Sequence, residues 1–357
     1  MKKEMKRLHS LALCIALLSF ILPLNAQASC TLLGATGKAT ADGNAYIAST
    51  SDNPWIEGPR KPVYVTIPQN GFKFVHTPCL ILQADGSFLD VGSDRGMNEK
   101  GFSWTRSWVV PKEAEAANKM SGVDWFIKLG STVATVDEAI AFVKNNPKGI
   151  GCQGNYIFAD AQGNLAIVEV SYSTVTVAGK WNKNDAGYGA RANRWETQSM
   201  IPLDDSARGN PVYYNSSPYR YPKAMALLKA ASGTIDVAGM KTLISFRDPK
   251  DADPTAPHEN AISNHGREGG TVSAEVYDPA HKTFWYTYGW PDGDMSTFDK
   301  KVYGFNENAW GAGAWIPFIL DQLTEQGWYT DWEGRITPMG SRYVAKLIKE
   351  GSASRVK

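Results

Sequence analysis

The stretch NAQASCTLLGATGKATADG, residues 25–43, is the most informative part of this sequence. It places a cysteine directly after a sequence typical of a cleaved export signal, so the folded chain would begin at or next to that cysteine. Ahead of it, MKKEMKR is basic and LALCIALLSFILPL is an apolar run of the kind that forms a signal-peptide core. Small residues, Ala26 and Ala28, stand at the expected cleavage positions. We therefore expect residues 1–29 to be removed, which leaves a periplasmic or secreted protein that begins at Cys30.

The exact start of the mature chain stays open. A cut after Ala28 would leave Ser29 in front of the cysteine, so either the signal peptidase cuts after Ser29 or the protein removes Ser29 by attack of Cys30 on the preceding bond. A lipid-modified Cys30 is the alternative of another class, a lipid-anchored, non-catalytic binding protein. Lipoprotein signals usually have an aliphatic residue three positions before the cysteine, where this chain has Gln27.

Charge and hydropathy exclude several kinds of partner. The full chain of 357 residues carries 37 Lys and Arg against 36 Asp and Glu, a net charge of +1. Such a balance does not favour nucleic acid or an anionic membrane as partner. No stretch after the signal is apolar enough to span a bilayer, so we expect no stable membrane insertion. The sequence does not determine the oligomeric state.

Hairpin signals alternate with helical patterns beyond the cysteine. The strongest hairpin signals are Asn70–Gly71 and Asp85–Gly86, each flanked by alternating apolar residues. Thr135 and Glu138 form a capping box at the start of a helix. Further strands are expected over 155–178 and 270–290, and helices over 135–146, 221–232, 234–246 and 341–351. This order predicts an α+β fold built from antiparallel sheets.

Three cysteines follow the signal, namely Cys30, Cys79 and Cys152. In an oxidising compartment an odd number suggests one disulfide and one free thiol. If Cys79 pairs with Cys152, the free thiol is Cys30. The alternative is that both are buried free thiols, because cysteine packs well as a small apolar residue.

A cysteine at the first position carries its own base. A free thiol has a pKa of about 8.5 and an α-amine one of about 7.7–8.0, so the amine can take the thiol proton near neutral pH. N-terminal threonine nucleophiles work in the same way. The five histidines form no recognisable Cys–His motif, and no Cys/His pair has metal-ligand spacing. We expect neither a cofactor nor a metal.

From Cys30 onward the sequence resembles the N-terminal nucleophile (Ntn) hydrolases that begin with cysteine. This group holds choloylglycine hydrolases, penicillin V acylases and acyl-coenzyme A:6-aminopenicillanate acyltransferase-like proteins. The segments that carry the resemblance follow in the family's order: CTLLGATGKATADGNAYIASTSDNPW, DRGMNEKGFS, GNYIFADAQGNLAIVEVS, ARANRW, SSPYRY and EGGTVSAEVYDPAHKTFWYTYGWP. The resemblance extends to Pro291. It implies a single four-layer αββα domain over 30–357, with a C-terminal helical extension from about residue 300.

The resemblance also implies roles for four residues. Cys30 is the nucleophile and, through its amine, the base. Asp52 matches the aspartate that holds the cysteine's amino group, and Asn193 matches the asparagine that supports the oxyanion or the amine. Arg220 matches the arginine of the family's SSxxRF segment. Structural alternatives are an ion pair for Arg220 and a turn or cap for Asn193.

The sequence departs from the family's pattern at two points. The family often has RNxDW on the second strand, whereas Ser49 and Thr50 stand in place of that arginine and asparagine. Arg60 or Arg106 are candidates to replace the arginine in space. Choloylglycine hydrolases have an asparagine where this chain has Trp108, so one oxyanion donor must come from elsewhere, such as a backbone N–H.

The expected reaction is hydrolysis of a linear carbon–nitrogen amide bond through a thioester on Cys30. The substrate would be a small-molecule amide with an apolar acyl group, contacted by Trp55, Trp104 and Trp108 if these line a cleft and do not belong to the core. Acyl transfer to another amine requires that water be kept from the thioester. A secreted dipeptidase of the related N-terminal-cysteine class, whose opening also reads CT…G…ATADG, is the alternative enzyme, and substrates with a free amine discriminate the two.

Overall fold

A computed structural model describes most of the chain beyond the expected signal. The described residues are 30–54, 61–82, 88–90, 92–115, 119–149, 151–205, 211–247, 261–263, 269–292, 314–332 and 334–350. The signal segment 1–29, the turn at Asp85–Gly86 and the side chains of Trp55 and Arg60 lie outside them.

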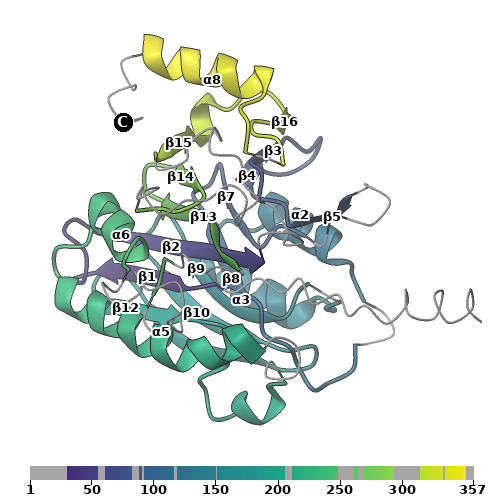
Figure 1. The fold of residues 1–357 in the computed structure, drawn as a ribbon, viewed down its shortest axis with the longest axis vertical. Helices are drawn as coiled ribbons and strands as arrows, with labels where there is room; N and C mark the ends of the chain where they lie inside the picture. The colour runs from purple at the N-terminus through teal and green to yellow at the C-terminus, as the bar shows by residue number, and fades with distance from the viewer. Residues whose placement is uncertain are drawn as a thin grey trace, which may run out of the picture.

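A six-stranded antiparallel sheet forms one half of the molecule (Figure 1). Its order is β12–β1–β2–β13–β14–β15. The strands are β1 (Leu32–Gly37), β2 (Gly43–Pro54), β12 (Ala186–Arg191), β13 (Gly269–Asp278), β14 (Thr283–Tyr288) and β15 (Ile316–Ile319). The central strands β1, β2 and β13 are buried on both faces, so they are rich in small and apolar residues and lack strict alternation.

An eight-stranded antiparallel sheet forms the other half, in the order β11–β10–β9–β8–β7–β4–β3–β16. The strands are β3 (Tyr64–Thr66), β4 (Phe74–His76), β7 (Arg95–Asn98), β8 (Ser103–Ser107), β9 (Gly154–Ala159), β10 (Leu165–Val170), β11 (Val175–Trp181) and β16 (Gly327–Trp328). A separate pair joins β5 (Leu80–Leu82) to β6 (Phe88–Asp90). The hairpin expected at Asn70–Gly71 is confirmed, because β3 pairs with β4 and Gly71 has a φ of +120°.

Helices pack against both sheets. The α-helices are α2 (Gly122–Thr132), α3 (Val136–Asn145), α5 (Pro211–Ala231), α6 (Val237–Ile244) and α8 (Pro338–Lys349), and two short 3₁₀ helices are η1 (Ile201–Leu203) and η3 (Leu320–Gln322). The expected capping box is confirmed, since Thr135 accepts from the Glu138 N–H and the Glu138 side chain accepts from the Thr135 N–H. Helix α5 begins ten residues earlier than the sequence predicted and so includes Arg220. The pattern analysis missed α2.

The three largest apolar clusters of the described residues hold these parts together. One packs α5 and α6 on the six-stranded sheet, through residues such as Leu33, Ala48 and Leu228. A second packs α2 and α3 on the eight-stranded sheet, and the third contains residues of both sheets, such as Ile47 and Ile157. The fold is therefore α+β with two large antiparallel sheets. At Gly34 a Cβ would lie 3.0 Å from the Ile157 and Leu165 side chains, so glycine permits close approach of the two sheets here.

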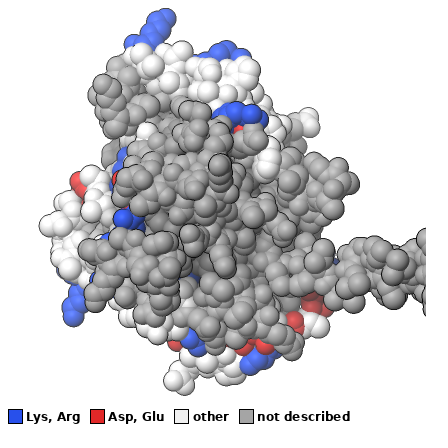
Figure 2. All heavy atoms as spheres, in the orientation of Figure 1, with Lys and Arg blue, Asp and Glu red and all other residues white. Residues whose placement is uncertain are grey.

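The C-terminal part holds strands as well as the expected helix. After residue 300, β15 joins the six-stranded sheet, β16 joins the eight-stranded sheet, and α8 packs Tyr343 and Leu347 into the core between the sheets. No helix among the described residues has the length and apolar character needed to cross a membrane. On the face drawn in Figure 2, the described Lys, Arg, Asp and Glu side chains are scattered and form no large patch of one sign.

Cys79 and Cys152 form no disulfide. Both are buried free thiols, as is Cys30. Of the two alternatives that the cysteine count left open, the structure shows the buried thiols and not the bridge.

Candidate active site

Strand register brings Cys30 and Asn193 together. Strand β1 pairs antiparallel with β12 so that Leu32 faces Arg191, and continuing this register by two residues sets Cys30 opposite Asn193. The backbone N–H of Cys30 donates to Asn193 Oδ1 at 2.8 Å. Two residues that lie 163 positions apart in the chain are thus juxtaposed by one hydrogen-bonded strand pair.

The Asn193 side chain is held in one orientation. Its Nδ2 donates to the backbone carbonyl of Trp108 at 3.0 Å, and its backbone N–H donates to Ser217 Oγ at 3.1 Å. With the amide nitrogen facing a carbonyl, the amide oxygen is the atom that faces Cys30. Asn193 therefore presents an acceptor to the nitrogen of the cysteine, which suits the orientation of an amine.

Arg220 reaches the same place from helix α5. Its Nη1 donates to the Cys30 carbonyl at 2.7 Å and to Thr31 Oγ1 at 3.0 Å, while its Nη2 donates to Asn193 Oδ1 at 3.0 Å. One guanidinium thus contacts both the cysteine's carbonyl and the asparagine that contacts its nitrogen. The side chain is almost fully buried, so these hydrogen bonds form away from bulk water.

Asp52 lies buried on β2. Its Oδ1 accepts from Thr271 Oγ1, across the β2–β13 pair, at 2.7 Å. Its Oδ2 has no hydrogen-bond partner among the described residues. Burial raises the pKa of Asp52 to about 6, although the positive charge of Arg220 and the Thr271 hydrogen bond oppose that shift. A buried carboxylate oxygen without a partner is costly, and it is an acceptor for a nearby cationic donor.

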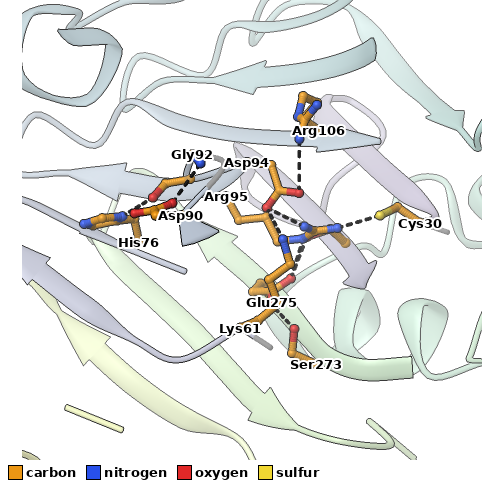
Figure 3. Close-up of polar contacts among 12 residues, drawn as sticks. Cys30, Lys61, His76, Asp90, Gly92, Asp94, Arg95, Arg106, Ser273 and Glu275 are labelled. Atoms are coloured by element: carbon orange, nitrogen blue, oxygen red, sulfur yellow. Dashed lines mark hydrogen bonds and ion pairs between the residues drawn. The ribbon is translucent and has the colours of Figure 1, made fainter. Parts of the chain in front are cut away.

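The sulfur of Cys30 is contacted by a residue that the sequence did not single out for a role. Arg95, the first residue of β7, extends from the eight-stranded sheet and places its Nη2 at 2.9 Å from Cys30 Sγ (Figure 3). The same nitrogen donates to the Thr50 carbonyl at 2.7 Å. Arg95 lies within the segment DRGMNEKGFS, but nothing local distinguishes it from any arginine at a strand start.

Arg95 is fixed by groups of the six-stranded sheet. Its Nε lies 3.0 Å from Glu275 Oε2 and donates to Ser49 Oγ at 3.2 Å. Ser49 in turn donates to Glu275 Oε2 at 2.8 Å, and Ser273 donates to the other carboxylate oxygen at 2.8 Å. Glu275 and Ser49 are cross-strand partners in the β2–β13 pair, so the sheet register itself builds the recess that receives the guanidinium.

A second carboxylate joins Arg95 to two further cations. Asp94 Oδ1 lies 2.7 Å from Arg95 Nη1 and 2.8 Å from Lys61 Nζ, and its Oδ2 lies 3.6 Å from Arg106 Nη2 (Figure 3). Burial alone would raise the pKa of Asp94, but the three cations outweigh it and hold the pKa well below its usual range. The carboxylate is therefore ionised, and its side chain is 3 % exposed.

The charges around Cys30 act in opposite directions on its thiol. Burial raises the pKa of the Cys30 thiol above its ordinary value, and the positive charge of Arg95 opposes that shift. Asp94 and Asp52 raise the pKa further, and Lys61 lowers it. In this setting the thiolate depends on Arg95, the one of these cations that touches the sulfur.

The buried histidine His76 does not contact the thiol. The buried His76 ring lies between Thr66 Oγ1, at 2.9 Å from Nε2, and Ser93 Oγ, which hydrogen-bonds Nδ1. Both ring nitrogens are thus occupied, and burial lowers the pKa of His76 to about 3. His76 is therefore held in a neutral, hydrogen-bonded state apart from the thiol.

A sequence model of one enzyme family matches residues 42–292 of the chain, and its description is acyl-coenzyme A:6-aminopenicillanic acid acyl-transferase. The chain belongs to this family. Comparison with curated proteins gives no match.

Solved structures with a similar arrangement include penicillin V acylase from Agrobacterium tumefaciens, at 17% identity and a TM-score of 0.46, over 72% of this chain and 83% of that one. A mutant of the conjugated bile acid hydrolase from Clostridium perfringens matches at 11% identity and a TM-score of 0.47, over 86% of this chain and 98% of that one.

Of the four site residues expected from the family resemblance, hydrogen bonds join Cys30, Asn193 and Arg220. Asp52 is close enough for its charge to act on Cys30. Two alternatives that the sequence left open are now decided. Arg106 does not reach the sulfur. Its guanidinium lies over the rings of Trp108 and Phe126, at 5.0 and 5.6 Å from their centres, and donates to the Gln153 carbonyl. Trp104 is fully buried in the core between the eight-stranded sheet and α2 and α3, so it does not line a cleft.

Trp108 contacts the site through its backbone. The carbonyl of Trp108 accepts from Asn193 Nδ2. Among the described residues, no group of three or more His, Cys, Asp or Glu side chains is placed to hold a metal ion.

Proposed function

We propose that the protein hydrolyses linear amide C–N bonds with Cys30 as an N-terminal nucleophile. The observation that carries this is that every polar atom of Cys30 has its own partner: Arg95 at the sulfur, Asn193 at the nitrogen and Arg220 at the carbonyl. A structural cysteine needs none of these contacts. Membership of a family of acyl-transferring enzymes supports the same reaction class.

The proposed reaction passes through a thioester. The neutral α-amine of Cys30 takes the thiol proton, and the thiolate attacks the amide carbon, so that a C–S bond forms and negative charge develops on the carbonyl oxygen. The C–N bond then breaks, and the ammonium gives its proton to the leaving amine. Water attacks the thioester with the amine again as base, the acid leaves, and the thiolate recovers its proton. A backbone N–H would stabilise the oxyanion, since Asn193 Nδ2 is already engaged by the Trp108 carbonyl.

The buried oxygen of Asp52 supports a free amine at Cys30. Its Oδ2 has no hydrogen-bond partner within the described part of the chain and its carboxyl is fully buried. An ammonium on Cys30 would supply both a hydrogen bond and a positive charge. We therefore propose that the mature protein begins at Cys30, after export to the periplasm or beyond, and that it works as an αββα Ntn sandwich.

Mass spectrometry of the purified mature protein tests the first step. We expect an N-terminal peptide that begins with an unmodified Cys30. A chain that retains Ser29 while fully active would exclude the amine as base, and a diacylglycerol adduct on Cys30 would favour the lipid-anchored binding protein.

A substrate panel tests the reaction. Amides of one chromogenic amine with acetyl, hexanoyl, decanoyl and phenoxyacetyl groups should be hydrolysed at rates that depend on the acyl group, since the acyl part becomes the thioester. A trapped Cys30 acyl adduct should appear in the intact mass. Rates that ignore the acyl group but rise with a free α-amine on the substrate would instead give the dipeptidase. Adding a second amine as acceptor measures acyl transfer.

A further inference from the structure

The family's pattern places an arginine on the second strand, and Ser49 stands there instead. The small Ser49 side chain leaves space beside Cys30, and its hydroxyl accepts from Arg95 Nε. Arg95 enters that space from the eight-stranded sheet and contacts the sulfur at 2.9 Å. Serine and arginine thus complement each other across the interface between the sheets.

We propose that Arg95 is the catalytic cation that stabilises the Cys30 thiolate in this protein, with Ser49 and Glu275 as the residues that position it. The inference rests on the proposed function for its meaning in catalysis, while the contact between guanidinium and sulfur can be tested without any substrate. It assigns a role to a residue of a different strand, and a different sheet, from the one the family pattern indicates.

Charge in the buried cluster supports this role. The ion pairs join three cations, Lys61, Arg95 and Arg106, to two carboxylates, Asp94 and Glu275. All five side chains are at most 3 % exposed. One positive charge is left over when both carboxylates are ionised, and a thiolate at Cys30 balances it. Buried charge is stable only where it is paired, so the cluster favours an anion at the sulfur.

The geometry gives Arg95 a fixed aim. The guanidinium plane is held at three nitrogens: Nη1 by Asp94, Nε by Glu275 and Ser49, and Nη2 by the Thr50 carbonyl. A planar guanidinium that is held in this way loses little entropy on meeting the sulfur. The charged groups around Cys30 come from several elements: Arg95 and Asp94 at β7, Asp52 on β2, Lys61 before β3, Glu275 on β13 and Arg220 on α5.

The test is the pH dependence of Cys30 alkylation by iodoacetamide, followed by peptide mass spectrometry so that Cys79 and Cys152 are counted separately. Because an adjacent opposite charge shifts a pKa by about 1–3 units, Arg95→Met should raise the apparent pKa of Cys30 by at least about one unit and slow alkylation at neutral pH by about tenfold or more. Arg95→Lys should fall between wild type and Arg95→Met. The matched control is Arg106→Met, which removes another buried cation of the cluster that does not touch the sulfur and should shift the Cys30 profile clearly less than Arg95→Met does.

A second pair of variants guards against misfolding and sharpens the result. Arg95→Met leaves Glu275 unpaired, so Arg95→Met combined with Glu275→Gln lowers the unpaired buried charge and should show the same upward shift. Combining Ser49→Arg with Arg95→Ser returns the arginine to β2 and should alkylate faster at neutral pH than Arg95→Ser alone. An unchanged alkylation profile in folded Arg95→Met, or in the double variant with Glu275→Gln, overturns the proposal. If the alkylation profile shifts but the wild-type protein hydrolyses no amide, the contact between Arg95 and Cys30 stands and only the proposed function is wrong.

Discussion

The two sheets contribute different kinds of groups to Cys30. The six-stranded sheet supplies the cysteine itself and Asp52, and the register of β1 with β12 brings Asn193 to the Cys30 nitrogen. The eight-stranded sheet supplies the cation at the sulfur, Arg95, inside a network of buried charges that continues through Asp94. The contact that strand register sets, between Cys30 and Asn193, therefore lies within one sheet. The ion pairs and the sulfur contact of Arg95 span the interface between the two sheets.

The largest effect is expected at the nucleophile. Cys30→Ala should abolish amide hydrolysis, because no other described thiol contacts Arg95 or Asn193, and it should leave thermal unfolding close to wild type, because only one buried atom is lost. Turnover with the panel of chromogenic amides and a melting curve check this. Residual turnover at the wild-type rate would mean that the six-stranded sheet does not hold the nucleophile.

Asp52→Asn should have the next largest effect, a loss of about 10²–10⁴ in kcat, since a group that orients the acid–base catalyst is removed. Its pH dependence has a definite sign. Burial raises the pKa of Asp52 to about 6, so protonation below about pH 6 removes the carboxylate, and wild-type activity should fall as the pH falls through that region. A neighbouring ammonium on Cys30 would move this fall in activity to lower pH, because it favours the ionised carboxylate. Full wild-type activity that declines only as the pH rises through 6 would contradict the assignment.

Asn193→Ala should lower kcat by about 10²-fold, because it removes the acceptor that orients the Cys30 nitrogen and so misplaces the base. A rise in KM alone would not satisfy the prediction. Asn146→Ala is a matched control, because it removes an amide at the end of α3 that hydrogen-bonds the Phe142 carbonyl. Equal rates in both variants would show that Asn193 is only a turn residue.

The buried ion pairs around Asp94 predict an effect on stability. Asp94→Asn removes a carboxylate from between buried cations and should cost about 3–5 kcal/mol in the free energy of unfolding, because the cations are left uncompensated. Urea unfolding of the whole protein measures it.

The smallest effect is expected at an exposed ion pair, which serves as the control for Asp94→Asn. Lys180→Met breaks the ion pair with Asp137, whose side chains are 48 % and 73 % exposed, and should cost at most about 1 kcal/mol because water screens the pair. Similar losses in the two variants would mean that the cluster around Asp94 is no more than a surface-like ion pair.

The sequence was sufficient to predict most of the strands and the four candidate site residues. Turn residues at Asn70–Gly71, the capping box at Thr135 and the order of quoted segments lead to an α+β fold, and family motifs lead to Cys30, Asp52, Asn193 and Arg220. These signals are local, since a turn or a cap is determined by a few neighbouring residues. They failed for α2, and they placed the start of α5 too late.

By itself, then, the sequence indicated Cys30 as the candidate nucleophile and Asp52, Asn193 and Arg220 as its candidate partners. Tertiary structure alone decided that Arg95, and not Arg106, meets the sulfur, and that Trp104 belongs to a helix–sheet core. Both outcomes depend on which face of a strand a residue occupies and on which sheet packs against that face. Arg95 and Arg106 both lie on neighbouring strands of one sheet, but Arg95 faces the six-stranded sheet and Arg106 faces α2. Successive residues of a strand point to opposite faces of the sheet, and the sequence does not say which face packs against the other sheet and which against a helix.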